Sequence, residues 1–230
     1  TPSTHTRERG GKLYAIFTSD GTTKWTYNTE YLHVFSSPAI SVNNDVVYFG
    51  GGFKIHAVRL SDGSKLWTYK TMGIVFASPL VTSGQPHFDS ETIYIGSDDR
   101  LLHAIRGSDG EKLWGYQTAG EIQSSPTISA DGSTIFVGSN DGTLHAVRSR
   151  DGVGIWKFPT GASIKNSPAI SRDGTVFIGT ENGMLHAVVT MSGQAKWTYQ
   201  IHGGGIVTSS PAVSASGSII YVGATDRRLH

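Results

Sequence analysis

Three observations on the amino-acid sequence predict an all-β fold, a β-propeller built from four-stranded antiparallel blades. The five tryptophans follow one another at intervals of 42, 47, 42 and 41 residues, and a period in the forties is typical of propeller blades or of long helical repeats. Gly accounts for 29 of the 230 residues, and Ser, Thr, Val, Ile and Tyr are frequent, which favours short strands over helices. Each period also divides into four extended runs separated by turn residues, as a propeller blade requires.

The four predicted strands are clearest in the fourth period, at residues 166–171, 175–179, 184–189 and 195–200. The first of them holds a Ser-Pro pair, and such pairs recur at 37–38, 78–79, 125–126, 167–168 and 210–211, where Pro removes no needed ladder donor. A longer first hairpin around residues 85–90 accounts for the one long interval.

Asp-Gly pairs mark the turns, at 20–21, 62–63, 109–110, 131–132, 141–142, 151–152 and 173–174. Gly accepts positive φ, and the Asp side chain can bond the backbone ahead of it. We therefore interpret these aspartates as turn formers and not as catalytic groups.

Every tryptophan closes one eleven-residue phrase, in which Ala is followed by five residues, Gly, three residues and Trp. The copies are Ala15, Gly21 and Trp25; Ala57, Gly63 and Trp67; Ala104, Gly110 and Trp114; Ala146, Gly152 and Trp156; and Ala187, Gly193 and Trp197. This phrase resembles the tryptophan-docking motif of the quinoprotein (PQQ-like) β-propeller repeat family, and the resemblance covers nearly the whole chain. It implies that each Trp packs against the Gly peptide and the Ala of neighbouring blades.

The phrase departs from the family pattern at two positions. The family often carries Asp or Asn at the third position, where this chain has Phe17, Arg59, Arg106, Arg148 and Val189. Asp, where the family has Thr, usually precedes the Gly. The departures affect the polar contacts of the family and leave the docking expectation in place.

The strands at the two ends of the chain, identified by their position within a blade, predict how the propeller is completed. Residues 12–28 hold a third and a fourth strand, and residues 209–223 hold a first and a second strand, so the two halves sum to one blade. We expect a single propeller domain over residues 12–230, with five blades and a 2+2 strand closure that hides the sheet edges. The alternative is a fragment of a seven- or eight-bladed propeller. Residues 1–11 are polar and are expected to form a flexible N-terminal edge.

Bulk composition argues against several classes of function. The formal net charge is +1 without a basic stripe, which disfavours nucleic acid as a partner, and no segment approaches the ~20 apolar residues of a membrane span. The chain has no cysteine, so disulfides, thiolate nucleophiles and Cys-ligated zinc are excluded. The sequence also contains no nucleophile elbow, zinc-protease motif or phosphate loop.

The family resemblance raises the question of a quinone cofactor. Members that bind pyrroloquinoline quinone hold it between a Trp and a disulfide of adjacent cysteines, beside Ca²⁺ on acidic and amide side chains. This chain has no cysteine, and all five Trp are assigned to docking. The carboxylates that could bind Ca²⁺ lie one or two per blade without a calcium-loop motif, at Asp98, Asp99, Asp141, Glu181 and Asp226.

We therefore predict no catalytic residue, no cofactor and no metal, and keep a PQQ-dependent dehydrogenase as an alternative. The resemblance implies a non-catalytic member similar to the propeller of the outer-membrane assembly lipoprotein. It also implies a periplasmic or extracellular location.

One repeat position carries His56, His103, His145 and His186, with Tyr14 and His230 in the same phase. Third strands lie about 10 Å outside the innermost strands, so equivalent residues on adjacent blades are too far apart for zinc ligands, which bind at about 2 Å. We expect these rings to pack half-buried between blades, with one nitrogen hydrogen-bonded.

Function is predicted on the loops that lead into the innermost strands, here called the inner loops. Three residues before each Ser-Pro serine the chain is always β-branched, which predicts inward packing, at Val34, Val75, Ile122, Ile164 and Val207. The next residue points the opposite way and varies between copies, as Phe35, Phe76, Gln123, Lys165 and Thr208. The residue before the aliphatic position is also variable, and includes His33 and Glu121.

Such variation on a shared scaffold suits an asymmetric binding face. Phe35 and Phe76 would form an apolar anchor, and Gln123, Glu121 and Lys165 would add polar contacts. The sequence thus predicts a non-catalytic protein-interaction scaffold. One alternative is a lectin-like propeller that binds carbohydrate between its blades, and another is an excised or engineered repeat module that only folds. Ordinary surface divergence accounts for the variable residues equally well.

Overall fold

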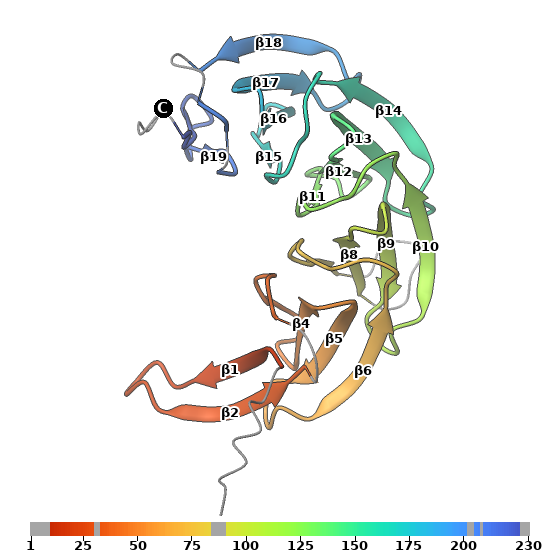
Figure 1. The fold of residues 1–230 in the computed structure, drawn as a ribbon, viewed down its shortest axis with the longest axis vertical. Helices are drawn as coiled ribbons and strands as arrows, with labels where there is room; N and C mark the ends of the chain where they lie inside the picture. Colours follow the sequence, from red (N-terminus) through yellow and green to blue (C-terminus); the bar gives the residue numbers. More distant parts are fainter. Residues whose placement is uncertain (1–9, 30–32, 84–90, 202–204, 208, 226–230) are drawn as a thin grey trace, which may run out of the picture.

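The computed structural model describes residues 10–29, 33–83, 91–201, 205–207 and 209–225. Within these residues the chain forms β-strands and no helix. Figure 1 shows the sheets side by side around an open arc, with the first strand of each blade toward the centre and the fourth on the outside. The predicted longer hairpin at residues 85–90 and nearly all of the predicted N-terminal edge lie outside the described residues.

Four complete blades each contain four antiparallel strands that are hydrogen-bonded in chain order. Their strands are β3 (Ala39–Ile40), β4 (Val46–Gly51), β5 (Lys54–Arg59) and β6 (Lys65–Lys70); β7 (Leu80–Thr82), β8 (Thr92–Gly96), β9 (Leu101–Arg106) and β10 (Lys112–Gln117); β11 (Thr127–Ile128), β12 (Thr134–Gly138), β13 (Thr143–Arg148) and β14 (Gly154–Pro159); and β15 (Ala169–Ile170), β16 (Thr175–Gly179), β17 (Met184–Val189) and β18 (Ala195–Gln200). The predicted all-β fold of four-stranded antiparallel blades is confirmed.

The innermost strands are shorter than predicted. In the fourth period β16, β17 and β18 have the predicted bounds, whereas β15 covers only Ala169–Ile170 of the predicted 166–171. The reason is that the preceding residues bond to the neighbouring blade, because the Ser167 N–H donates to Ser210 Oγ at 2.9 Å. Pro168 has no N–H to donate to a ladder.

This bond belongs to a ladder along the inner rim of the arc. The backbone N–H of each Ser-Pro serine donates to the hydroxyl of the next one, from Ser37 to Ser78 at 2.9 Å, Ser78 to Ser125 at 2.8 Å, Ser125 to Ser167 at 3.0 Å and Ser167 to Ser210 at 2.9 Å. The Ser-Pro pair therefore joins neighbouring blades as well as preceding a strand.

The two half blades do not close the ring. β1 (Lys12–Ile16) pairs only with β2 (Thr23–Asn28), and β19 (Ala212–Val213) pairs only with β20 (Ile220–Tyr221), among the described residues. Figure 1 shows these two hairpins at opposite ends of the open arc. The predicted 2+2 closure of a five-bladed ring is therefore not formed, and the open arc agrees with the alternative of an incomplete propeller. A chain that begins with the third strand of one blade and continues to the second strand of another has two matching half blades in a propeller of any size. Matching halves therefore do not fix the number of blades.

Tryptophan docking joins the outer parts of the blades. The Trp67 indole N–H donates to the Gly107 carbonyl at 2.8 Å, and a Cβ added at Gly110 would lie 2.6 Å from the Trp67 ring. The same arrangement recurs for Trp25 with Leu60 and Gly63, for Trp114 with Ser149 and Gly152, and for Trp156 with Thr190 and Gly193. Each Trp thus sits on the turn between the third and fourth strands of the next blade, and the prediction of glycine docking is confirmed for these four.

The Ala of the phrase has a different neighbour from the one expected. Ala57 is the cross-strand partner of Trp67 in the same blade, and Ala104, Ala146 and Ala187 face Trp114, Trp156 and Trp197 in the same way. All four alanines are fully buried. A small side chain at this position leaves room beside it for the indole of its cross-strand partner.

The two departures from the family phrase, Arg at the third position and Asp before the Gly, contact each other in two of the blades. Arg106 and Arg148, at the third position, form ion pairs with the turn aspartates Asp109 and Asp151 at 2.9 and 2.8 Å. The aspartates also accept the backbone N–H two residues on, as from Glu111 to Asp109 at 3.0 Å, which confirms their role as turn formers. These bonds lower the pKa of the Asp109 carboxyl, with the backbone bond as the larger cause. Exposed pairs of this kind contribute little to stability, so their effect is to shape the turn.

The hydrophobic core lies between successive blades rather than at one centre. One cluster combines Tyr48, Ile55 and Ala57 of the first complete blade with residues of the next, including Val75 and Ile93. The β-branched residues of the inner loops are central to these joints: Val75, Ile122, Ile164 and Val207 are almost fully buried, which confirms the predicted inward packing. Each approaches a glycine at or next to the end of the second strand of the preceding blade, at Gly50, Gly96, Gly138 and Gly179.

Candidate functional site

The inner loops and the turns between second and third strands form one face of the arc. The Val75 N–H donates to the Gly52 carbonyl at 2.9 Å, and the Gly52 N–H donates to the His33 carbonyl at 3.2 Å. The β4–β5 turn is therefore held between two inner loops. Equivalent bonds recur further along, such as Asn140 N–H to the Glu121 carbonyl at 2.8 Å. This face carries every described residue that the sequence predicted for partner binding.

An aromatic cluster occupies one end of this face. The rings of Phe35 and Phe76, on neighbouring inner loops, lie with their centroids 4.8 Å apart, and the His33 ring lies 5.7 Å from Phe35. Phe35 is 53% exposed and Phe76 is half-buried. The structure thus brings together three of the predicted residues as an anchor that spans two blades.

Two further apolar residues of this end were missed from the sequence. Phe53 is exposed in the β4–β5 turn, and Met72, which is 86% exposed, lies in the next inner loop. The bond from the Thr71 N–H to the Phe53 carbonyl, 2.9 Å long, holds these two segments together. Phe53 stands where the other blades have Arg100, Gly142 and Gly183, so comparing the turns between copies would have found it. We call His33, Phe35, Phe53, Met72 and Phe76 the apolar patch.

The other predicted residues do not join the apolar patch, because each bonds to a nearby turn. Gln123 Nε2 donates to Asp98 Oδ1 at 3.1 Å, and Asn140 Nδ2 donates to Glu121 Oε2 at 2.9 Å. Lys165 Nζ lies 2.7 Å from Glu181 Oε1. Burial raises the pKa of Asp98, the Gln123 bond opposes this, and the charges of Glu121 and Asp99 raise it further. The face therefore changes from apolar to polar and charged along the arc. Thr208 lies outside the described residues.

The repeated histidines connect neighbouring blades. His103 Nε2 donates to the Asp99 carboxylate at 3.1 Å, so its Nδ1 is free to accept the Tyr69 hydroxyl, also at 3.1 Å. Asp141, His145 and Tyr116 form the same chain one blade further on, and Tyr27 bonds to His56. The four rings at 56, 103, 145 and 186 are all buried, which confirms packing between blades and shows them more deeply enclosed than expected. His230 lies outside the described residues.

Because these histidines are buried, we expect the free energy of unfolding to fall in acid. Burial lowers the pKa of His145, against the opposing effect of Asp141, and burial alone lowers the pKa of His186. The unfolded chain then binds protons more readily than the folded one, so stability is full above the ordinary pKa of about 6.5 and falls as the pH drops below it. Urea unfolding at pH 7.5, 6.5 and 5.5 should show a steadily lower free energy of unfolding.

A His186→Phe variant provides the control for this pH dependence. It keeps a flat ring against Phe158, whose centroid lies 5.5 Å from that of His186, and removes one titrating group. Its free energy of unfolding should fall less steeply between pH 7.5 and 5.5 than that of the parent. Equal slopes of the free energy of unfolding against pH in the parent and the variant would contradict the contribution of His186. A parent stability that does not change with pH would contradict the role of the buried histidines altogether.

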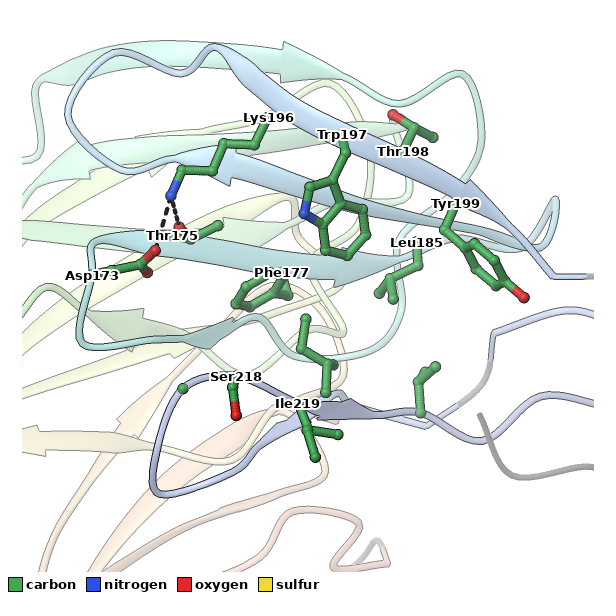
Figure 2. Close-up of a pocket in the computed structure, with 13 residues that line it drawn as sticks. Asp173, Thr175, Phe177, Leu185, Lys196, Trp197, Thr198, Tyr199, Ser218 and Ile219 are labelled. Carbon is green, nitrogen blue, oxygen red and sulfur yellow. Dashed lines mark hydrogen bonds and ion pairs between the residues drawn. The ribbon is translucent and has the colours of Figure 1, made fainter.

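A groove of about 770 Å³ opens between β18 and β20, at one end of the arc. Figure 2 shows Phe177, Leu185, Trp197 and Tyr199 facing this space from one side, with Ser218 and Ile219 on the other. Lys196 bonds to Asp173 at 3.0 Å at its edge. Trp197 is 43% exposed and its indole has no acceptor among the described residues, so the expectation that all five Trp are docked is wrong for Trp197. Its partner would be a turn beyond β20, and none is present in the described chain.

The groove does not fit pyrroloquinoline quinone. The three carboxylates of this cofactor need several cations, whereas the only basic side chain among the described lining residues is Lys196, which is paired with Asp173. In the described part of the chain, no three His, Asp or Glu side chains are grouped so that they could hold a metal ion.

The blades and their indole joints define a tryptophan-docked β-propeller repeat protein. Residues 4–73 and 74–229 match the PQQ-like family model described as outer membrane protein assembly factor BamB, and the chain belongs to this family. The resemblance drawn from the docking phrase is thereby confirmed.

Comparison with solved structures supports the fold. The crystal structure of BamB from Moraxella catarrhalis superimposes with a TM-score of 0.76 at 17% sequence identity, over 95% of this chain and 66% of that one. The chain thus spans about two thirds of the length of that protein. No curated protein matches the sequence. The described residues include no helix with the length and hydropathy needed to span a lipid bilayer.

Proposed function

We propose that this chain is a non-catalytic protein-interaction scaffold whose partner binds the face that carries the apolar patch. The observation that carries the proposal is the pair of Phe35 and Phe76, whose tilted rings lie 4.8 Å apart across two blades, with Phe35 exposed and Phe76 half-buried. Exposed aromatic residues on a rigid base are typical anchors of protein interfaces. Gln123, Glu121 and Lys165 extend the same face with polar groups.

The asymmetry of the face supports one protein partner over repeated sugars. A lectin-like propeller needs equivalent polar and aromatic pairs at each blade joint. Here one joint carries the phenylalanine pair, while others carry Gln123 with Asp98 and Lys165 with Glu181. The family description names an assembly factor for outer membrane proteins, and we propose a component of that assembly system as the partner.

The test is a double variant, Phe35→Asp with Phe76→Asp. Purified components of the outer-membrane assembly complex are immobilised, and Kd is measured by surface plasmon resonance. Loss of an interface hot spot typically costs 2 kcal/mol or more, so we expect at least about 30-fold weaker binding. Both phenylalanines lie away from the buried joints, so the melting temperature should hardly change.

Met191→Asp is the matched control. Met191 is as exposed as Met72 but lies in the β17–β18 turn, away from the inner loops. It should bind like the parent. Equal affinities for the parent and the double variant would contradict the proposed face, and a parent that binds no component would contradict the proposed partner.

A further inference from the structure

The fourth complete blade departs from a bonding pattern that the two blades before it share. In those two blades the turn between the second and third strands gives a carboxylate to the histidine four residues further on. Asp99 Oδ2 lies 3.1 Å from His103 Nε2, and Asp141 Oδ2 lies 3.2 Å from His145 Nε2. In the fourth complete blade Asn182 takes the place of the aspartate, so this position offers an amide and no carboxylate.

The histidine of the fourth complete blade is buried and short of hydrogen bonds. His186 is 6% exposed, its Nδ1 lies 3.3 Å from the Thr198 hydroxyl, and its Nε2 has no hydrogen-bond partner among the described residues. The neighbouring ring is Phe158, which has no hydroxyl to donate, whereas Tyr69 and Tyr116 bond to the equivalent histidines. A buried polar group without a partner lowers the stability of the fold.

Asn182 cannot serve this histidine because its acceptor oxygen is already used. Asn182 Oδ1 accepts the Thr180 hydroxyl at 2.5 Å. An amide has one acceptor oxygen, whereas a carboxylate has two. A carboxylate at position 182 could keep the Thr180 bond with one oxygen and accept the Nε2–H of His186 with the other. Asp99 divides its oxygens in this way, since Oδ1 accepts the Leu101 N–H at 3.0 Å and Oδ2 lies nearer the histidine of its turn.

Asn182 also stands before a glycine, and it is the only Asn of the chain that does. The residue is exposed in the turn, and Gly183 has φ 80°. Asn is a thermolabile residue, and a following Gly has no side chain to keep its backbone nitrogen from the side-chain carbonyl carbon. The Gly183 N–H donates to the Thr180 carbonyl at 3.1 Å, so the reaction requires the turn to open and is slower than in an unfolded peptide.

We propose that Asn182 is a deamidation site and that its conversion to aspartate completes a third carboxylate–histidine pair, with His186. The Gly183 backbone nitrogen attacks the side-chain carbonyl carbon of Asn182, a cyclic imide forms, and the side-chain nitrogen leaves as ammonia with the proton of the Gly183 N–H. Water then adds to the same carbon and breaks the new C–N bond. This step returns a proton to the Gly183 nitrogen and leaves a carboxyl group, which ionises at neutral pH. The inference is independent of the proposed partner binding.

Asn182→Asp reproduces the product and tests its effect on the fold. The carboxylate should accept the Nε2–H of His186, so we expect the melting temperature to rise by about 2–4 °C, as one added buried hydrogen bond gives in a chain of this size. Burial lowers the pKa of His186 in the parent, and a neighbouring negative charge favours the protonated ring. The pKa of His186 followed by NMR should therefore rise in the variant. In a His186→Phe background, Asn182→Asp should bring no gain in melting temperature.

Incubation of the parent in mildly alkaline buffer tests whether the reaction occurs in the folded chain. Trypsin releases residues 173–196, in which Asn182 is the only Asn, and mass spectrometry follows the change from amide to carboxyl. Fragmentation of the peptide distinguishes aspartate from isoaspartate, which the imide also yields. We expect the aspartate form, and the deamidated protein isolated by ion exchange should have the melting temperature and the His186 pKa of Asn182→Asp. An Asn182→Ser chain incubated alongside should change in neither.

Three results would overturn the proposal. The first is an Asn182 amide that persists in the folded protein long after the synthetic peptide 173–196 has been fully converted. The second is isoaspartate as the main product, because its longer backbone would misplace the carboxylate. The third is an Asn182→Asp chain whose melting temperature and His186 pKa equal those of the parent. None of these results involves the apolar patch, so the scaffold function stands or fails separately.

Discussion

Trp114→Ala is expected to lower the free energy of unfolding by about 3 kcal/mol, the lower end of the range for a buried tryptophan, because Trp114 is half-buried. The indole contributes a hydrogen bond to the Ser149 carbonyl at 3.0 Å and fills the space above Gly152. Its ring also lies 5.6 Å from that of the buried Tyr94. Removing it leaves a cavity in the joint between two blades, and the Ser149 carbonyl keeps only the bond from the Tyr94 hydroxyl at 3.0 Å. Guanidinium unfolding followed by circular dichroism measures the loss.

Trp197→Ala is the matched control for this loss. The residue has the same position in its blade and the same neighbour type, since Phe177 lies 5.8 Å away, but its outer side is open to the groove. Its loss should be clearly smaller than that of Trp114→Ala. Equal losses would show that the blade's own sheet, and not the joint, carries the stabilisation.

Gly138→Ala is expected to cost about 1–3 kcal/mol, the range for overpacking a tight core. The new Cβ would lie 2.1 Å from Cγ2 of Ile164, a buried side chain of the next blade that has no space into which to move. Either the blades separate slightly or Ile164 leaves its rotamer. The effect is measured as a lower midpoint of chemical unfolding.

Gly115→Ala is the control for a glycine in a strand. A Cβ at Gly115 in β10 would meet the end of the flexible Lys112 side chain at 3.0 Å, and this side chain can turn aside. Stability should stay the same or rise slightly, because Ala restricts the unfolded chain more than Gly does. A loss as large as that of Gly138→Ala would indicate a general intolerance of alanine in strands instead of a tight joint.

The repeated features could be predicted because each is encoded within one period. The bounds of β16, β17 and β18 follow from local turn chemistry, and the docking of Trp67 on Gly110 follows from a phrase present in every copy. The inward packing of Ile122 and Ile164 follows from strand alternation. In these cases local preference and the contacts in the fold agree.

The unpredicted features depend on relations between distant parts of the chain. The sequence shows which strands of a blade stand at each end of the chain. Whether these two ends meet depends on the angle between blades, which is set by packing at every joint. The docking phrase likewise identifies Trp197 as a docking residue but not whether a turn is present to receive it. Comparing the turns between copies singles out Phe53, but its place beside Phe35 depends on the bonds of Gly52, which join two separate segments of the chain.

The serine ladder gives the arc a mechanical property. Each complete blade is joined to the next complete blade at two radii, by the bond between Ser-Pro serines at the inner rim and by the indole on its glycine near the outer rim. Two contacts at different distances from the centre restrict rotation of one blade against the next, because a rotation that lengthens one contact compresses or shears the other. The arc is therefore expected to be rigid, so that side chains on different blades keep a fixed spacing when force is applied.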